Sequence, residues 1–167
     1  MKYKSNDMKG LVDKMRDVIQ QDLNDLAKVS DFTVAFGVPK GTNKEGQSIE
    51  EYARVNHDGS FSQNIPARPF LSTVRRRYSE KISADTKRAL EELKGEKFSQ
   101  GTLKNSDVKR VMMKNVALPL ENYAKDNVIS GSWVQNAPST VSKKGSSKPL
   151  VDQGEMVGSI NAIVVKR

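Results

Sequence analysis

The chain has 167 residues, a net charge of +8 and no cysteine, and it is 36% hydrophobic and 29% charged. This length suits one domain, residues 1–167, and the low apolar content predicts a small core that neighbouring chains help to order. Without cysteine the chain has no disulfide and no thiolate nucleophile, which suits folding in a reducing cytoplasm. The positive charge fits binding to DNA or to an acidic protein surface, and it fits a solvated lysine-rich surface equally well.

No segment of the sequence has the pattern of a membrane span or a signal peptide. The longest apolar runs, such as residues 163–165, are far shorter than the ~20 residues that cross a bilayer. The first residues, MKYKS, lack the apolar core of a signal peptide. We therefore expect no membrane partner.

An amphipathic helix is predicted within residues 1–31. Its apolar residues recur at spacings of three and four, which places them on one stripe: Leu11, Met15, Val18, Ile19, Leu23 and Leu26. The other face carries Lys14, Asp17, Gln21 and Asp25 and is predicted to face solvent.

Two strands are predicted near opposite ends of the chain, at residues 32–38 and 159–166. Both are rich in β-forming residues, and neither has another strand nearby in sequence, so we expect them to share a sheet. After the first strand, Ser48 is a candidate helix cap with Glu51 three residues on. The HDGS sequence at 57–60 predicts a turn.

A long helix is predicted to begin at Pro69 and to end at Gly95, because Leu71, Val74, Tyr78 and the apolar residues after them keep helical spacing. A third helix follows, which Pro119 should kink or end. Residues 132–156 are predicted to be an extended loop, poorly packed on its own subunit. The expected fold class is α+β: a small, mainly antiparallel sheet packed by the long helix, with the N-terminal amphipathic helix and the long loop.

The sequence contains no recognisable catalytic or metal-binding constellation. The only histidine, His57, is followed by Asp58, but one histidine without a nucleophile or a second ligand favours a polar turn over an acid–base pair. No zinc-site spacing, phosphate-binding loop or EF-hand is present. We expect no catalysis, no cofactor and no metal.

Two motifs together carry a resemblance to a known family. The first is ARVNHDG at 53–59 followed by IPARPFL at 65–71, which leads into the long helix. The second is Thr140, KKGS at 143–146 and PLVDQGEM at 149–156, with Ser159 and Ile160 after it. In this order and spacing, residues 32–167 resemble the neck, tail-completion and virion-morphogenesis proteins of tailed bacteriophages. The HD pair in the turn and Gln153 depart from the family pattern, which leaves tail-completion and head–tail connector subtypes open.

The resemblance implies a structural virion protein of the head–tail junction that forms a ring, expected to be a hexamer, and completes the tail or joins it to the head. It implies assembly in the host cytoplasm, location in the neck or tail of the virion, and DNA passage through the ring. The implied partners are further copies, the tail-terminator or tail-tube protein, and the head-closure or portal-side connector.

Five residues are candidates for interface contacts: Arg68, Trp133, Lys144, Leu150 and Asp152. Two prolines flank Arg68 and fix its direction, so we expect its guanidinium to bind a carboxylate, within the subunit or across an interface, unless the prolines only set the helix start. The alternative function is a DNA-binding accessory protein that uses the basic helix face, with Arg75, Arg76, Arg77, Lys81, Lys87 and Arg88.

Overall fold

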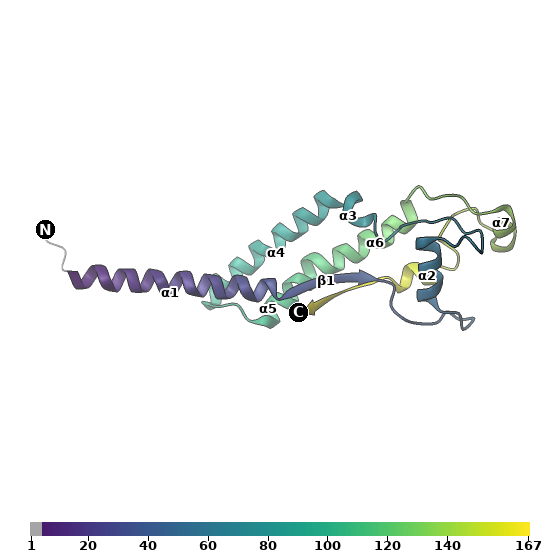
Figure 1. Ribbon diagram of the computed structural model, residues 1–167. Coiled ribbons are helices and arrows are strands. Elements are labelled where there is room, and N and C mark those ends of the chain that lie inside the picture. Colours follow the sequence, from purple (N-terminus) through teal and green to yellow (C-terminus); the bar gives the residue numbers. More distant parts are fainter. Residues whose placement is uncertain (1–4) are drawn as a thin grey trace.

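The computed structural model describes residues 5–167, apart from the side chains of residues 5–9, 11, 12 and 98. The chain is elongated, with α1 projecting at one end and α2 and α7 at the other (Figure 1). In order, the elements are α1 (Ser5–Ser30), β1 (Phe32–Gly37), α2 (Ile49–Asp58), α3 (Val74–Arg77), α4 (Ser79–Gln100), α5 (Asn105–Met112), the π-helical turn η1 (Met113–Ala117), α6 (Leu118–Ser130), α7 (Pro138–Lys144), α8 (Glu155–Ser159) and β2 (Asn161–Lys166). The fold is α+β, as the sequence predicts.

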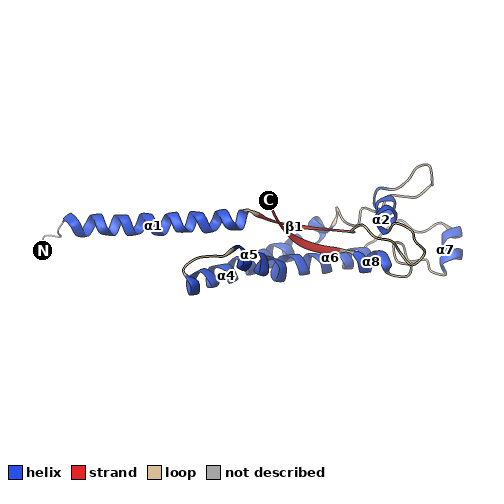
Figure 2. Cartoon of the chain, turned by 90° about the horizontal axis from the view of Figure 1, so that it is seen from below, coloured by secondary structure: helices blue, strands red, loops and turns tan. Residues whose placement is uncertain are grey.

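The two predicted strands pair with each other, which confirms their expected partnership. β1 and β2 are antiparallel, in a register that runs from Phe32 opposite Lys166 to Gly37 opposite Asn161. On the inner face, Phe32, Ala162 and Val164 are buried against α4, α5 and η1. The strands lie along one side of these helices (Figure 2).

The long helix differs from its prediction at both ends. It begins at Val74 instead of Pro69, and it is interrupted at Tyr78, where α3 ends and α4 begins. It continues through Gly95 to Gln100 and ends at Gly101, whose φ of 74° is the left-handed conformation that favours glycine. Gly95 lies inside the helix because one glycine costs only about 1 kcal/mol there, which the surrounding turns offset.

Pro119 neither ends nor breaks its helix. In the turn before it, the chain widens into η1, and the Leu118 N–H donates to the Met113 carbonyl five residues back. A proline ring clashes with the carbonyl four residues before it, so a widened turn relieves this clash and lets α6 continue.

The segment at 132–156 is not an extended loop, which corrects the prediction. It contains α7, and Leu150 and Met156 at its end are buried in the core with Phe70, Val74 and Ile160. Leu150 has a φ of 60°. This rare conformation in a leucine turns its side chain inward, where apolar burial offsets the backbone cost.

α1 contacts the body through Val29 near its C-terminal end and through polar side chains that were predicted to face solvent. Asp25, only 3% exposed, accepts hydrogen bonds from Lys28 and Gln21, and Lys28 also donates to the Leu103 carbonyl at 2.8 Å. The apolar stripe is exposed instead: Met15, Val18, Ile19, Leu23 and Leu26 are 54–64% exposed. Leu11 belongs to this predicted stripe, but its side chain lies outside the described residues.

The Asp25 contacts make the attachment of α1 dependent on pH. Burial alone raises the pKa of Asp25, but hydrogen bonds from Lys28, Gln21, the Leu103 N–H and Lys97 outweigh it and hold the pKa below its ordinary value. A carboxyl group with a lowered pKa in the folded state stabilises the fold above its unfolded pKa of ~4, and this contribution is lost as the pH falls through the folded value.

We therefore expect hydrogen-exchange protection of the last turns of α1 to fall below about pH 4 in the wild-type chain. Asp25→Asn should lose protection already at neutral pH and change little on acidification. Asp17→Asn, at an exposed position about two turns farther from the body on the same face of α1, is the control and should behave as wild type. Equal protection in all three chains would show that Asp25 does not hold α1.

Candidate functional site

The two sequence motifs meet at the end of the molecule that carries α2 and α7. The first motif forms the end of α2, a tight turn and the segment that leads into α3. Ser60 and Ile65 close the turn with a β-bridge, and the Arg68 N–H donates to the Asn56 carbonyl at 3.0 Å. The sequence predicts the cap of α2 correctly, because the Ser48 side chain accepts from the Glu51 N–H. The helix nevertheless includes His57 and Asp58, where a turn is predicted.

Gly59 is the point of closest approach between the two halves of the first motif. Its φ of 81° and ψ of 170° belong to a region that is essentially restricted to glycine. A Cβ atom at this position would lie 2.8 Å from the Ala67 nitrogen and 3.0 Å from the Ile65 carbonyl oxygen. The motif therefore needs glycine for both its conformation and its lack of a side chain.

Arg68 is buried, with 4% of its surface exposed, and all its partners are neutral. Its Nε donates to the Val134 carbonyl at 2.8 Å, and one terminal nitrogen donates to Asn56 Oδ1 at 3.3 Å. The other terminal nitrogen donates to the Gln135 carbonyl and to Asn136 Oδ1, both at 3.2 Å. The expected carboxylate contact is therefore wrong among the described residues, and Arg68 is not available at an interface.

The four acceptors define what Arg68 does. It ties the segment after α6 to the end of α2, and Asn136 extends the link by donating to the Lys148 carbonyl. Lys144 donates to the same carbonyl at 2.8 Å. Burial lowers the pKa of Arg68, but arginine remains charged near neutral pH. Because all five guanidinium N–H groups are in a rigid fork, one side chain can hold this many acceptors together.

His57 is held as part of the same structure. Its Nδ1 lies 2.8 Å from Asp58 Oδ1, its Nε2 accepts from the Ser72 N–H, and its ring packs edge-on against Phe70. Both ring nitrogens are engaged, so the ring orients the chain between α2 and α3. Within the described residues, no group of three or more His, Cys, Asp or Glu side chains is arranged to hold a metal ion.

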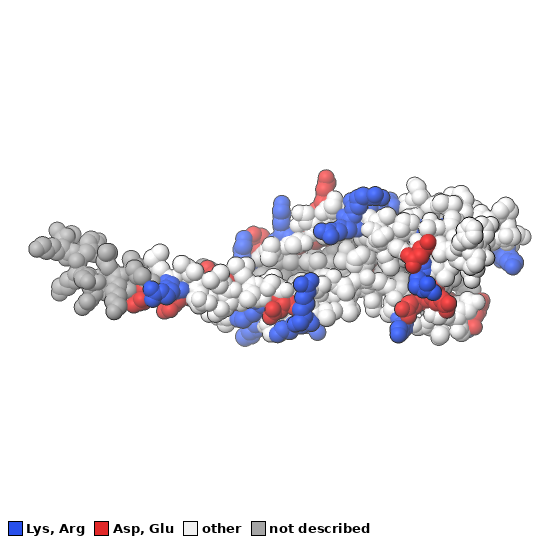
Figure 3. All heavy atoms as spheres, in the orientation of Figure 1, with Lys and Arg blue, Asp and Glu red and all other residues white. Residues whose placement is uncertain are grey.

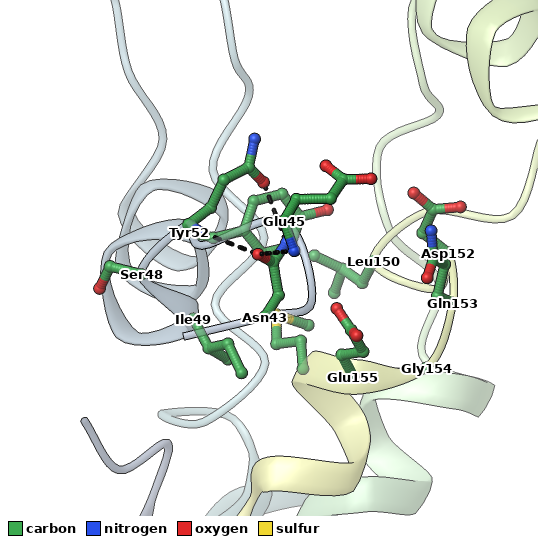
Figure 4. A pocket seen from close by; sticks show the side chains of 12 residues that line it. Asn43, Glu45, Ser48, Ile49, Tyr52, Leu150, Asp152, Gln153, Gly154 and Glu155 are labelled. Atoms are coloured by element: carbon green, nitrogen blue, oxygen red, sulfur yellow. Dashed lines mark hydrogen bonds between the residues drawn. The ribbon is translucent and has the colours of Figure 1, made fainter. Parts of the chain in front are cut away.

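A small pocket lies between the loop before α2 and the start of α8 (Figure 4). Its volume is about 110 Å³, and its lining includes Asn43, Tyr52, Leu150, Asp152 and Glu155. Leu150 forms its apolar floor, while the carboxylates of Glu45, Asp152 and Glu155 surround it. Asp152, one of the predicted interface residues, is exposed and lines this pocket.

The other predicted interface residues have different positions. Leu150 is core, and Trp133 is half-buried, donates its indole N–H to the Val128 carbonyl and lies against Gly131. Lys144 is partly exposed at the end of α7. Burial lowers its pKa, the Asp152 carboxylate opposes this shift and the nearby Arg68 adds to it.

The predicted basic face is interrupted by contacts within the chain. Arg77 donates to Asn127 and Ser130, and Arg88 donates to Asp85 at 2.9 Å. Arg75, Arg76 and Lys87 are exposed, and basic side chains gather over the α3–α4 junction in Figure 3. The face therefore offers fewer free cations than its sequence suggests.

Comparisons with known proteins found no relative that could help to interpret this geometry. No protein-family model, curated protein or solved structure matches the chain. The resemblance of the two motifs to phage neck proteins therefore stays a prediction.

Two surfaces that the sequence analysis did not assign as sites are exposed and apolar. One is the α1 stripe. The other is the outer face of the sheet, where Ile163 is 49% and Val165 is 42% exposed. The sequence AIVV at 162–165 indicates the second of these surfaces, because it makes both faces of the strand apolar. Strands of this kind are typically covered on both faces. No described helix is long and apolar enough to span a bilayer.

Proposed function

We propose that the chain is a structural virion protein of the phage head–tail junction, which forms a ring and completes the tail or joins it to the head by binding alone. The observation that carries this proposal is the exposed apolar stripe of α1. A projecting helix with five half-exposed apolar side chains is unusual on a monomer, and exposed apolar patches of this kind mark protein interfaces.

The construction of the other end supports the same function. Arg68, Asn56 and Gly59 are used to make a rigid end to the molecule, and the pocket beside them presents carboxylates. In a ring, one end of each subunit would face the tail tube or terminator and the other the head-closure or portal-side connector. Rigid ends and an extended shape suit a subunit that bridges two larger assemblies, since little conformational entropy is lost on binding.

The test is complementation in a phage that carries the gene. Deleting the gene should produce filled heads and separate tails under the electron microscope, with infectivity restored by the wild-type chain supplied in trans. Purified chain should form rings in negative stain. Particles of normal morphology and titre without the gene would contradict the proposal.

The alternative is a DNA-binding accessory protein that uses Arg75, Arg76 and Lys87. If it holds, the purified chain should shift duplex DNA at nanomolar to micromolar concentration, with an affinity that falls steeply as salt rises. Arg75→Ala combined with Arg76→Ala should abolish that shift. Under our proposal the shift is weak or absent, and the double variant still restores infectivity.

A further inference from the structure

We propose that the apolar stripe of α1 docks on the outer face of the β1–β2 sheet of a second copy of the chain. This inference rests on the proposed ring and names the contact that builds it. The two surfaces are defined by their side chains: Met15, Val18, Ile19, Leu23 and Leu26 on the helix, and Thr33, Ala35, Ile163 and Val165 on the sheet.

The first step concerns the sheet, which has a covered and an uncovered face. Thr33 lies opposite Val165 and Ala35 opposite Ile163, and these two pairs form the outer face. A two-stranded sheet is marginal without a helix or further strands packed on it, and among the described residues only the inner face is packed by helices. The outer face of the sheet is therefore the one without a packed layer of helices or strands.

The second step excludes the chain's own helix as that layer. Only Asp31 separates the end of α1 from the start of β1, so α1 cannot turn back over the strand that follows it. Asp25 and Lys28 also fix its opposite side to Leu103, which directs the stripe away from the body. In Figure 1, α1 extends beyond the sheet toward the N-terminal end. Any α1 on the outer face must come from another copy.

The third step is the match in size. The stripe from Met15 to Leu26 spans about 17 Å at 1.5 Å per residue, and a six-residue strand spans about the same length. A helix is roughly 10 Å across, which equals the width of two strands about 5 Å apart with their side chains. Small and β-branched residues on the sheet leave a flat surface that accepts the ridge of a helix.

The fourth step is the area. Half-exposed side chains of this size each offer on the order of 100 Å² of apolar surface, so the two faces together would bury roughly 750 Å². Interfaces are a little over half apolar, which implies a total near ~1,300 Å², inside the range of specific protein–protein contacts. Because the two patches differ, the contact is heterologous, and such contacts repeat around a ring when the rotation closes.

The chain's lack of cysteine allows a direct test by disulfide cross-linking. Leu23→Cys and Ile163→Cys are made in separate chains that carry tags of different mass, mixed, and oxidised. The mixture should yield a dimer containing one chain of each mass. Asn24→Cys, one residue along α1 and turned away from the stripe, is the matched control and should not cross-link to Ile163→Cys.

A second measurement uses sedimentation velocity. Wild type should be oligomeric, and Leu23→Lys with Leu26→Lys should weaken self-association on the order of a hundredfold while keeping the far-ultraviolet circular dichroism of the wild type. Cross-links between two Leu23→Cys chains would overturn the inference in favour of helix pairing. Wild-type rings without the mixed cross-link would overturn the inference and leave the proposed function standing. A monomeric wild type that floats with anionic vesicles would overturn both.

Discussion

Replacing Arg68 with alanine should destabilise the fold by about 3–5 kcal/mol, because it leaves buried acceptors without donors and opens a cavity. The acceptors are the carbonyls of Val134 and Gln135 and the side chains of Asn56 and Asn136. Arg68→Lys should cost at least about 2 kcal/mol, since lysine keeps the charge but loses the planar fork. Urea unfolding followed by circular dichroism measures both.

The control for Arg68 is Arg76→Ala. Arg76 is exposed on α3, so its removal should change the free energy of unfolding by no more than about 0.5 kcal/mol. In phage complementation, Arg68→Ala and Arg68→Lys should both reduce infectivity, and Arg76→Ala should not. If Arg68→Lys is as stable as wild type, the planar guanidinium does not contribute to stability. The charge at position 68 or the chain direction set by the two prolines would then be sufficient.

Gly59→Ala should destabilise the fold by about 3 kcal/mol or more, for two separate reasons. Its backbone conformation is one that residues with a side chain rarely adopt, and its new Cβ would lie 2.8 Å from the Ala67 nitrogen. Backbone atoms cannot move aside as a flexible side chain can, so the α2 end and the segment at Arg68 must separate. Thermal and urea unfolding both report the change.

Gly46→Ala separates the two causes. Gly46 also has a positive φ, 78°, but no atom lies within 4 Å of its hypothetical Cβ. Gly46→Ala should therefore lower the free energy of unfolding only by the cost of the backbone conformation, about 1 kcal/mol. Equal losses at the two positions would mean that the close approach to Ala67 contributes nothing.

Several parts of the fold follow from local sequence. The Ser48 cap depends on a group three residues away, and the helical spacing from Val74 to Leu93 depends on groups three and four residues apart. The pairing of β1 with β2 could be predicted over a long separation because each strand had only one candidate partner. The extension of α4 past Gly95 could not be predicted from local sequence. The free-energy cost of one glycine in a helix is small beside the stabilisation from the packing of Leu93 and its neighbours.

The site was predicted in part. The structure brings the two motifs together, which the sequence analysis did not predict, and the pocket includes the candidate Asp152. Three of the four partners of Arg68 lie 66 to 68 residues away, and two of these are backbone carbonyls, which carry no mark in the sequence. Leu150 was assigned to an interface as an apolar anchor in a predicted extended loop, whereas its unusual φ directs it into the core.

By itself, the sequence determined the amphipathic character of α1, the two strands and the Ser48 cap of α2, because these depend on residue type and short-range spacing. Only the tertiary structure decided which side of α1 meets the body. Helical periodicity identifies an apolar face but does not say what covers it, and here Asp25 and Lys28 find acceptors and donors around Leu103 that satisfy them in a buried place. The apolar side of α1 is therefore left exposed.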